Sequence, residues 1–191
     1  MGHINIDPAT RTMDWRASGH LSKPHRRRSV LHTRWAISRA VRKTFIGLHA
    51  RTYSHATEDL EKVKSAFSNA VGDLELKISK TVGHHGNPIT VIEGETKDAK
   101  TISGFFERLS EDDLNSIIRT IDARTDEGCN LFLRIDKQAA LDGIVRLTEG
   151  EDAVSVRIRV GAFPSRCEVA KDLVKTFVTE ELVRRCDQSG Q

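Results

Sequence analysis

The sequence lacks several features that would assign it to a membrane or a secreted class. No apolar run approaches the roughly 20 residues that a membrane-spanning helix requires, and the first 30 residues contain no unbroken apolar stretch like that of a secretory signal. The three cysteines, Cys129, Cys167 and Cys186, show no C-x-x-C spacing. We therefore expect neither a structural disulfide nor a cysteine-rich zinc site, and a reducing cytoplasm is the simplest location.

The common catalytic and cofactor motifs are also missing. The sequence has no H-x-x-x-H pair, no phosphate-binding loop of the Walker type, no dinucleotide fingerprint and no nucleophile elbow. His84 and His85 are neighbours, and neighbouring side chains in an extended chain point to opposite sides, which disfavours a shared metal ion. We therefore expect no catalytic residue, no metal and no cofactor.

Charge is distributed unevenly along the chain, although the net charge is only +3. Residues 1–44 contain ten Lys/Arg and two acidic residues, a net charge of +8, so the remaining 20 basic and 25 acidic residues give residues 45–191 a net charge of −5. We expect residues 1–43 to be a basic, disordered extension, with one amphipathic helix possible over residues 29–43. The extension could add nonspecific phosphate contacts. Residues 44–180 are expected to form the domain, and residues 181–191 a C-terminal tail.

Hydrophobic periodicity in residues 44–180 predicts an α+β fold, with a largely antiparallel sheet and helices packed on one face. Its predicted order is β-α-β-β-α-α-β-(α)-β-β-α. Helix starts are indicated at Thr57, Ser110 and Ser165, and a helix stop at Gly72. The expected strands are 45–54, 73–81, 89–95, 131–136, 143–148 and 153–163.

Connectivity predicts that four polar loops meet at one rim of the sheet. The first two strands are joined by a helix, so they should run in the same direction and end at the same edge. The later turns then bring two further strand ends to that edge. The loops expected there contain His55, residues 83–87, residues 136–138 and residues 163–166.

The side chains of this rim fit nucleic acid better than a metal or a nucleophile. Histidine planes can stack on bases, amides can bind base edges or sugars, and basic groups can bind phosphates. The candidate RNA-binding residues are His55, His84, His85, Asn87, Lys137, Gln138 and Arg166, together with Arg157 and Arg159 on the solvated face of their strand. A structural interpretation stays open for each: the histidines can shape a glycine-rich turn, Lys137 can be a solvated lysine, and Asp136 can be a helix cap.

Four segments carry a resemblance to a known family. RTYSHATEDLEKV (51–63), KTVGHHGNPI (80–89) and LFLRIDKQAAL (131–141), followed by VRIRVGAFPSR (156–166), resemble an archaeal RNA-binding family described as predicted exosome subunits. That family is related in fold to the large-subunit ribosomal protein that binds 5S RNA. The resemblance covers roughly residues 44–180. It implies an α+β fold, RNA binding and a possible association with the exosome. The motif positions in this sequence are His55, His84, His85, Gly86, Asn87, Asp136, Lys137 and Gln138.

The favoured hypothesis is a non-catalytic RNA-binding protein that acts as an accessory factor in RNA processing or degradation, with RNA and exosome subunits as partners. One alternative is a small hydrolase or nucleotide-modifying enzyme with His55 or His84 as general base. The other is a protein–protein adaptor that uses acidic helices, with Glu111, Asp112 and Asp113 at the contact.

Overall fold

The computed structural model describes residues 44–83, 86–162 and 166–189. His84, His85, the possible helix at 29–43 and the helix cap expected at Ser165 lie outside these residues. No helix of the described part of the chain is long and apolar enough to cross a membrane.

The core of the fold is one five-stranded sheet in the order β2-β3-β1-β5-β4, and every pairing in it is antiparallel. As the helical connection predicts, β1 and β2 run in the same direction, but β3 lies between them. The strands are β1 (Phe45–His55), β2 (Leu76–Val82), β3 (Pro88–Thr96), β4 (Asn130–Asp136) and β5 (Ala153–Val160).

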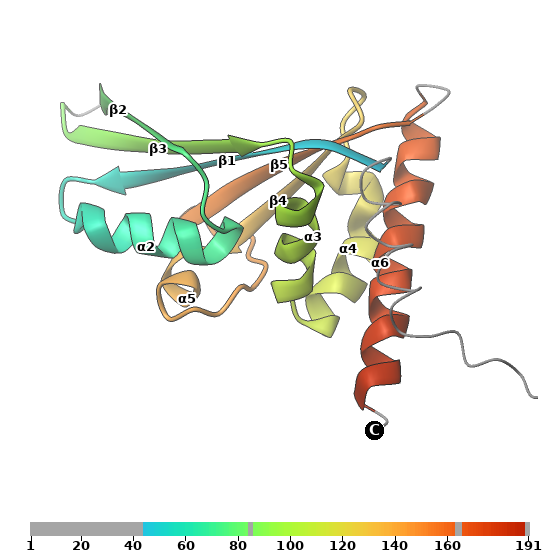
Figure 1. Cartoon of the computed structure of the whole chain (residues 1–191). Coiled ribbons are helices and arrows are strands. Elements are labelled where there is room, and N and C mark those ends of the chain that lie inside the picture. The colour runs from blue at the N-terminus through green and yellow to red at the C-terminus, as the bar shows by residue number, and fades with distance from the viewer. Residues whose placement is uncertain (1–43, 84–85, 163–165, 190–191) are drawn as a thin grey trace, which may run out of the picture.

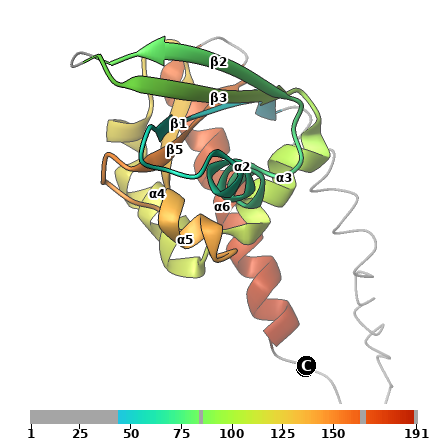
Figure 2. The same ribbon diagram turned by 90° about the vertical axis from the view of Figure 1, so that its left-hand side faces the viewer.

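All the described helices lie on one face of this sheet, and the other face is uncovered by described residues (Figures 1 and 2). This arrangement confirms the predicted α+β class. The helices are α2 (Leu60–Val71), α3 (Ala99–Arg108), α4 (Glu111–Arg124), α5 (Lys137–Leu141) and α6 (Cys167–Ser189).

Local capping explains where the helices begin and end. Gly72 ends α2 with φ of 91°, a left-handed conformation that favours glycine, and the Ser110 side chain caps α4 by accepting the N–H of Asp113. Both positions were predicted. The start of α2 differs, because the Asp59 side chain accepts the first free N–H groups instead of Thr57.

Three phenylalanine rings fasten the helical layer to the sheet. Phe45 of β1 stacks on Phe106 of α3, with ring centroids 5.2 Å apart, and meets Phe177 of α6 edge to face at 5.1 Å. Phe106 and Phe177 also contact each other at 5.2 Å. These rings are almost fully buried, so the helices cover one sheet face firmly and leave the other available.

Residues 143–148, predicted as a strand, do not join the sheet. They contact β4 through the isolated bridge between Ile135 and Leu147. The alternating pattern of this segment still corresponds to alternating burial, because Val145 is buried while Ile144 is 58% exposed. Alternating hydrophobicity shows which side chains face inward. It does not by itself show that the segment pairs with a neighbouring strand.

The loss of that strand reverses the predicted direction of the next one. β5 runs antiparallel to both β1 and β4, so its C-terminal end lies beside Phe45 and Asn130. Arg166, which follows β5, is therefore at the opposite end of the sheet from Lys137. The predicted convergence of Arg166 on the rim is therefore wrong, and residues 163–165 lie outside the described residues.

Residues 181–189 continue α6, where the sequence suggested a tail. Glu181 is only 1% exposed. The Arg185 guanidinium donates to the backbone carbonyl oxygens of Leu109, Phe106 and Glu107, at 2.6, 3.0 and 3.0 Å. Because these carbonyls belong to the C-terminal end of α3, the end of α6 stabilises the body of the domain.

Candidate nucleic-acid interface

The predicted rim exists in part. β1 and β4 end at the same edge of the sheet, which brings His55 near Lys137 through a shared partner. Glu58 accepts the His55 backbone N–H at 2.8 Å and lies 2.7 Å from the Lys137 ammonium nitrogen. The β2–β3 turn, with exposed Asn87, is at the same end of the strands but on β2, the edge strand furthest from β4.

Lys137 is not the exposed phosphate contact that the sequence predicts. It is 3% exposed, and its ammonium group binds the Tyr53 carbonyl oxygen at 3.1 Å and the carboxylates of Glu58 and Asp152. An ammonium group has three protons, and here they meet three oxygens. Lys137 thus joins β1 to the N-terminal regions of α2 and β5, and the solvated-lysine interpretation is also wrong.

Gln138 and Asp136 are occupied by neighbouring groups as well. The Gln138 amide donates to Asp152 at 3.0 Å. Partial burial raises the pKa of Asp152, but the hydrogen bonds from Gln138 and Lys137 outweigh it, so this pKa lies below its usual range. Asp136 caps α5, and the Ala139 N–H and the Arg146 guanidinium lower its pKa. The cap interpretation of Asp136 is confirmed.

The uncovered sheet face carries several basic side chains on neighbouring strands. Outward-facing residues of β1, β5 and β4 stand opposite one another in three rows across these strands. Arg51, Ser155 and Arg134 form one row, His49, Arg157 and Phe132 the next, and Gly47, Arg159 and Asn130 the third.

The guanidinium groups in these rows differ in whether they have partners. Arg51 donates to Glu93 at 2.7 Å, and this bond lowers the pKa of the Glu93 carboxyl. Within the described residues, Arg134, Arg157 and Arg159 have no side-chain hydrogen bond and no ion pair. Charges left without protein partners on an exposed face are available to phosphates.

Two aromatic rings accompany this charge. Tyr53 is 43% exposed and Phe132 is 44% exposed, both on the uncovered face. Exposed aromatic rings can stack on the bases of a nucleic acid of any sequence. The sequence prediction placed Arg157 and Arg159 on this face but did not select Phe132 or Arg134, although the alternation in LFLRID points both outward.

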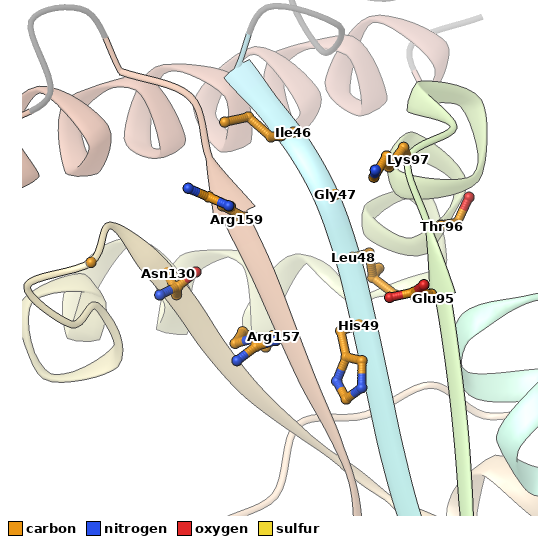
Figure 3. A pocket seen from close by; sticks show the side chains of 11 residues that line it. Ile46, Gly47, Leu48, His49, Glu95, Thr96, Lys97, Asn130, Arg157 and Arg159 are labelled. Carbon is orange, nitrogen blue, oxygen red and sulfur yellow. The ribbon is translucent and has the colours of Figure 1, made fainter. Parts of the chain in front are cut away.

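Two adjoining hollows lie over the β1, β5 and β4 part of the face, and a third, lined by His49 and by Glu75, Glu93 and Glu95, lies over β2 and β3. One hollow, of about 780 Å³, lies where β1 begins and β5 ends, and Figure 3 shows Arg157, Arg159, Asn130 and His49 around it. The second, of about 600 Å³, is lined by Arg134, Phe132 and Arg157 among others. Both hollows share His49 and Arg157, so they form one continuous basic surface. We call this surface the basic face: His49, Arg51, Tyr53, Asn130, Phe132, Arg134, Arg157 and Arg159.

Metal-binding chemistry is not visible in the described part of the chain, where no three His, Cys, Asp or Glu side chains lie close enough to hold an ion. Arg166 is exposed but belongs to the far end of β5, on the side of the 780 Å³ hollow rather than the rim.

A family model described as RNA binding matches residues 48–160. The chain belongs to this RNA-binding family. An RNA-binding protein of Pyrococcus abyssi is 35% identical over 144 residues, which cover 70% of this chain and 94% of that protein. An uncharacterized protein of Methanocaldococcus jannaschii is 30% identical over 139 residues, covering 67% of this chain and 91% of that one.

A solved structure from the archaeon Methanothermobacter thermautotrophicus, described as a DUF54 protein, has the same fold. It superimposes with a TM-score of 0.64 at 31% identity, covering 71% of this chain and 98% of that chain. The resemblance to an archaeal RNA-binding family is thereby confirmed. The matched residues begin at 48, so the basic extension lies outside the family match.

Proposed function

We propose that this member of the RNA-binding family is a non-catalytic RNA-binding protein and that RNA lies across its basic face. The observation that carries this proposal is a set of three guanidinium groups, Arg134, Arg157 and Arg159, which form no side-chain hydrogen bond or ion pair with any described residue. They lie beside an exposed phenylalanine ring on an uncovered sheet. Arginine without a carboxylate partner binds phosphate oxygens by bidentate hydrogen bonds, and aromatic rings stack on bases.

The basic face contrasts with the rest of the described surface. Arg124 and Arg146 are paired with Glu149 and Asp136, and Lys171 lies between Asp122 and Glu168. These pairs neutralise part of the charge on the helical side, and residues 45–191 as a whole are acidic. A local patch rather than bulk charge therefore supplies the attraction for RNA.

The residues predicted from the family motifs extend this interface in the proposal. His55, Asn87 and Gln138, with His84 and His85, would contact RNA that passes the end of β1 and the β2–β3 turn. Arg166 would contact RNA at the opposite end of β5. We do not include Lys137 among the proposed RNA contacts, because it is buried and its ammonium group binds three protein oxygen atoms.

The family resemblance is the support for the finer role that we propose. In this proposal the protein is an accessory factor in RNA processing or degradation in the cytoplasm, with exosome subunits as partners, and its fold is related to that of the 5S-RNA-binding ribosomal protein. Co-purification with exosome subunits after RNase treatment tests the partnership, and loss of the subunits on RNase treatment would reduce it to a shared RNA.

Fluorescence anisotropy with labelled RNA over a series of salt concentrations tests the basic face. The triple variant Arg134→Gln, Arg157→Gln, Arg159→Gln should bind more weakly and lose about 2 from the slope of log K against log salt, since each phosphate contact with a single strand contributes about 0.7. Arg119→Gln, at an exposed arginine of α4 on the covered side, is the matched control and should bind like the wild type. Equal affinity and slope in the triple variant would contradict the proposal.

The hydrolase alternative has a direct test. The protein is incubated with nucleotides and RNA, with and without divalent metal ions, and the products are separated by chromatography. We expect no turnover. Turnover that is lost in His55→Ala would overturn the non-catalytic part of the proposal.

The adaptor alternative is weakened because one of its three acidic residues, Asp113, is used inside the fold. Asp113 accepts hydrogen bonds from the Ser110 hydroxyl at 2.8 Å and from the Leu147 N–H at 3.2 Å. Its carboxylate therefore joins the start of α4 to the 143–148 segment, which is a structural role.

A further inference from the structure

The 780 Å³ hollow on the basic face has the size of a small-ligand site. It lies between the first residues of β1, the last residues of β3 and β5, and the first residue of β4 (Figure 3). The lining includes three cationic side chains, Lys97, Arg157 and Arg159, and one anionic side chain, Glu95. The hollow therefore favours an anionic ligand.

Two arginines form its cationic side. Arg157 and Arg159 are two residues apart on β5, so their side chains leave the same face with about 7 Å between their Cα atoms. Neither guanidinium has a side-chain partner among the described residues. Two guanidinium groups at this spacing can bind one phosphate from two sides.

The floor of the hollow is backbone because residue 47 is glycine. Gly47 stands opposite Arg159, and the β1–β3 ladder begins only at Leu48 and Thr96. A Cβ atom at residue 47 would lie 3.3 Å from the Thr96 carbonyl oxygen and 3.8 Å from Lys97 Cγ. A larger side chain would thus enter the hollow, whereas glycine leaves room for a planar group to approach the strand.

Asn130 offers an acceptor at the same place. Its amide nitrogen donates to both carboxylate oxygens of Asp126, at 3.1 and 3.0 Å. The orientation of the amide is thereby fixed, and its carbonyl oxygen is left for a donor such as a ribose hydroxyl or an amino group of a base. The hydrogen bonds from Asn130 also lower the pKa of Asp126, so this anchoring carboxylate is ionised at neutral pH.

An apolar side chain and a ring stand next to the glycine. Ile46 is 48% exposed in the lining, and His49 follows two residues after Gly47. Together with the backbone at Gly47 they offer flat and apolar contact to a sugar or a base. The hollow thus offers cations for a phosphate, an acceptor for a hydrogen-bond donor, and a flat apolar surface for a ring. A nucleotide has all three of the matching groups.

We propose that this hollow binds one nucleotide unit, with its phosphate between Arg157 and Arg159, its ribose or base against Gly47 beside Ile46 and His49, and a donor group on the Asn130 carbonyl oxygen. This inference rests on the proposed RNA binding, because an RNA chain is the source of the nucleotide. A free nucleoside monophosphate has the same chemistry and serves as the probe.

The experiment is an amide NMR titration of the ¹⁵N-labelled full chain with adenosine monophosphate, adenosine, inorganic phosphate and a short single-stranded RNA. Adenosine monophosphate and RNA should both shift the amide signals of Gly47, Asn130 and Arg159. Arg159→Gln should weaken the binding of adenosine monophosphate about tenfold, because one charge-assisted contact is lost. Gly47→Val should abolish its binding by filling the floor.

Arg134→Gln is the matched control, since Arg134 is on the basic face but outside the hollow. This variant should bind RNA more weakly and should bind adenosine monophosphate with unchanged affinity. The spectrum away from the hollow shows whether each variant is folded, and Arg159→Gln keeps the test valid where Gly47→Val does not fold.

The possible failures can be told apart. RNA shifts at Arg134 and Phe132 without any shift from adenosine monophosphate would overturn the nucleotide site and leave the RNA-binding proposal intact. Equal binding of inorganic phosphate and adenosine monophosphate would show a phosphate site only and would also overturn the inference. Absence of any RNA shift would overturn both proposals. Free nucleotide binding as tightly as RNA would identify a nucleotide-binding protein and remove RNA as the source.

Discussion

The ammonium nitrogen of Lys137 lies 3.1 Å from the backbone carbonyl oxygen of Tyr53, a residue 84 positions earlier in the chain. The same ammonium binds Glu58 and Asp152. A lysine that the family motif marks as a binding residue is thus a buried link between β1, β4 and their neighbouring loops. Its role in this structure is to hold the end of the sheet together.

Replacing this lysine should therefore affect stability more than RNA affinity. Lys137→Met removes the cation from two carboxylates and a carbonyl, and we expect a loss of about 2–3 kcal/mol in the free energy of unfolding, because charged hydrogen bonds are broken and partly buried anions remain. Urea unfolding measures the loss. Lys80→Met, at an exposed lysine of β2, is the control and should change little. A stable variant with lost RNA affinity would restore the contact role.

Phe132 should contribute to RNA affinity and hardly to stability. Its ring is 44% exposed, and stacking of one base on an aromatic ring is worth about 1–3 kcal/mol. We expect Phe132→Ala to weaken single-stranded RNA by roughly tenfold or more, and Phe132→Tyr to retain affinity. Anisotropy measures both. Val183→Ala, at an exposed apolar residue of α6, should bind normally, and equal losses in both alanine variants would contradict stacking.

Asp136 should make stability depend on pH in the acid range. Hydrogen bonds from the Ala139 N–H and from Arg146 lower its pKa below the ordinary 3.8, so its contribution is present above pH 3.8 and is lost as the pH falls through the lower folded-state pKa. Asp136→Asn keeps a capping oxygen but not the charge. It should be about 1 kcal/mol less stable than wild type at pH 7 and nearly equal at the lowest pH.

Chemical unfolding of both proteins between pH 7 and pH 2 checks this convergence. Asp142→Asn, at the exposed C-terminal cap of α5, is the matched control, and its difference from wild type should not converge in this way. A constant difference between wild type and Asp136→Asn across the range would show that the charge contributes nothing.

The cysteines should differ in their reaction with iodoacetamide. Burial raises the pKa of the Cys167 thiol above its ordinary value of 9.0, and the thiol donates a hydrogen bond to the Asp126 carbonyl oxygen at 3.1 Å. Cys186 is exposed and Cys129 is buried. At pH 8, mass spectrometry should find Cys186 modified first, because the thiolate is the reactive species. Rapid modification that persists in Cys186→Ser would contradict this order.

Removing the end of α6 should destabilise the domain. Deletion of residues 181–191 takes away Arg185 and its three hydrogen bonds to the end of α3, and Glu181, which is almost fully buried. At about 1 kcal/mol for each hydrogen bond, we expect a loss of about 3 kcal/mol, measured by thermal unfolding. Deletion of residues 190–191 alone is the control. No change on the longer deletion would support the predicted tail.

Much of the fold could be predicted because local signals agree with it. The stop at Gly72 and the cap at Ser110 depend on backbone conformation and on one side chain each, and both are visible in sequence. The directions of β1, β2 and β4 follow from their connections. A single wrong strand at 143–148 was enough to invert β5, because each antiparallel step depends on the one before it.

The candidate site could be predicted less well, because partners distant in sequence decide which charges are free. Arg51 and Arg157 both alternate outward on their strands, but Arg51 donates to Glu93 on β3, whereas Arg157 has no acidic group within bonding distance in the part of the chain that the structure describes. The burial of Lys137 likewise depends on Glu58 and Asp152. The hydrophobic periodicity of the sequence cannot predict these pairs, because their members are far apart along the chain.

The central position of β1 also determines where the extension joins the domain. Residues 1–44, with their ten basic side chains, lead directly into Phe45, and the next residue, Ile46, lines the hollow beside Arg157 and Arg159. These basic side chains are covalently linked to the strand that lines the hollow, so their concentration near an RNA bound there would be set by chain length and not by their amount in solution.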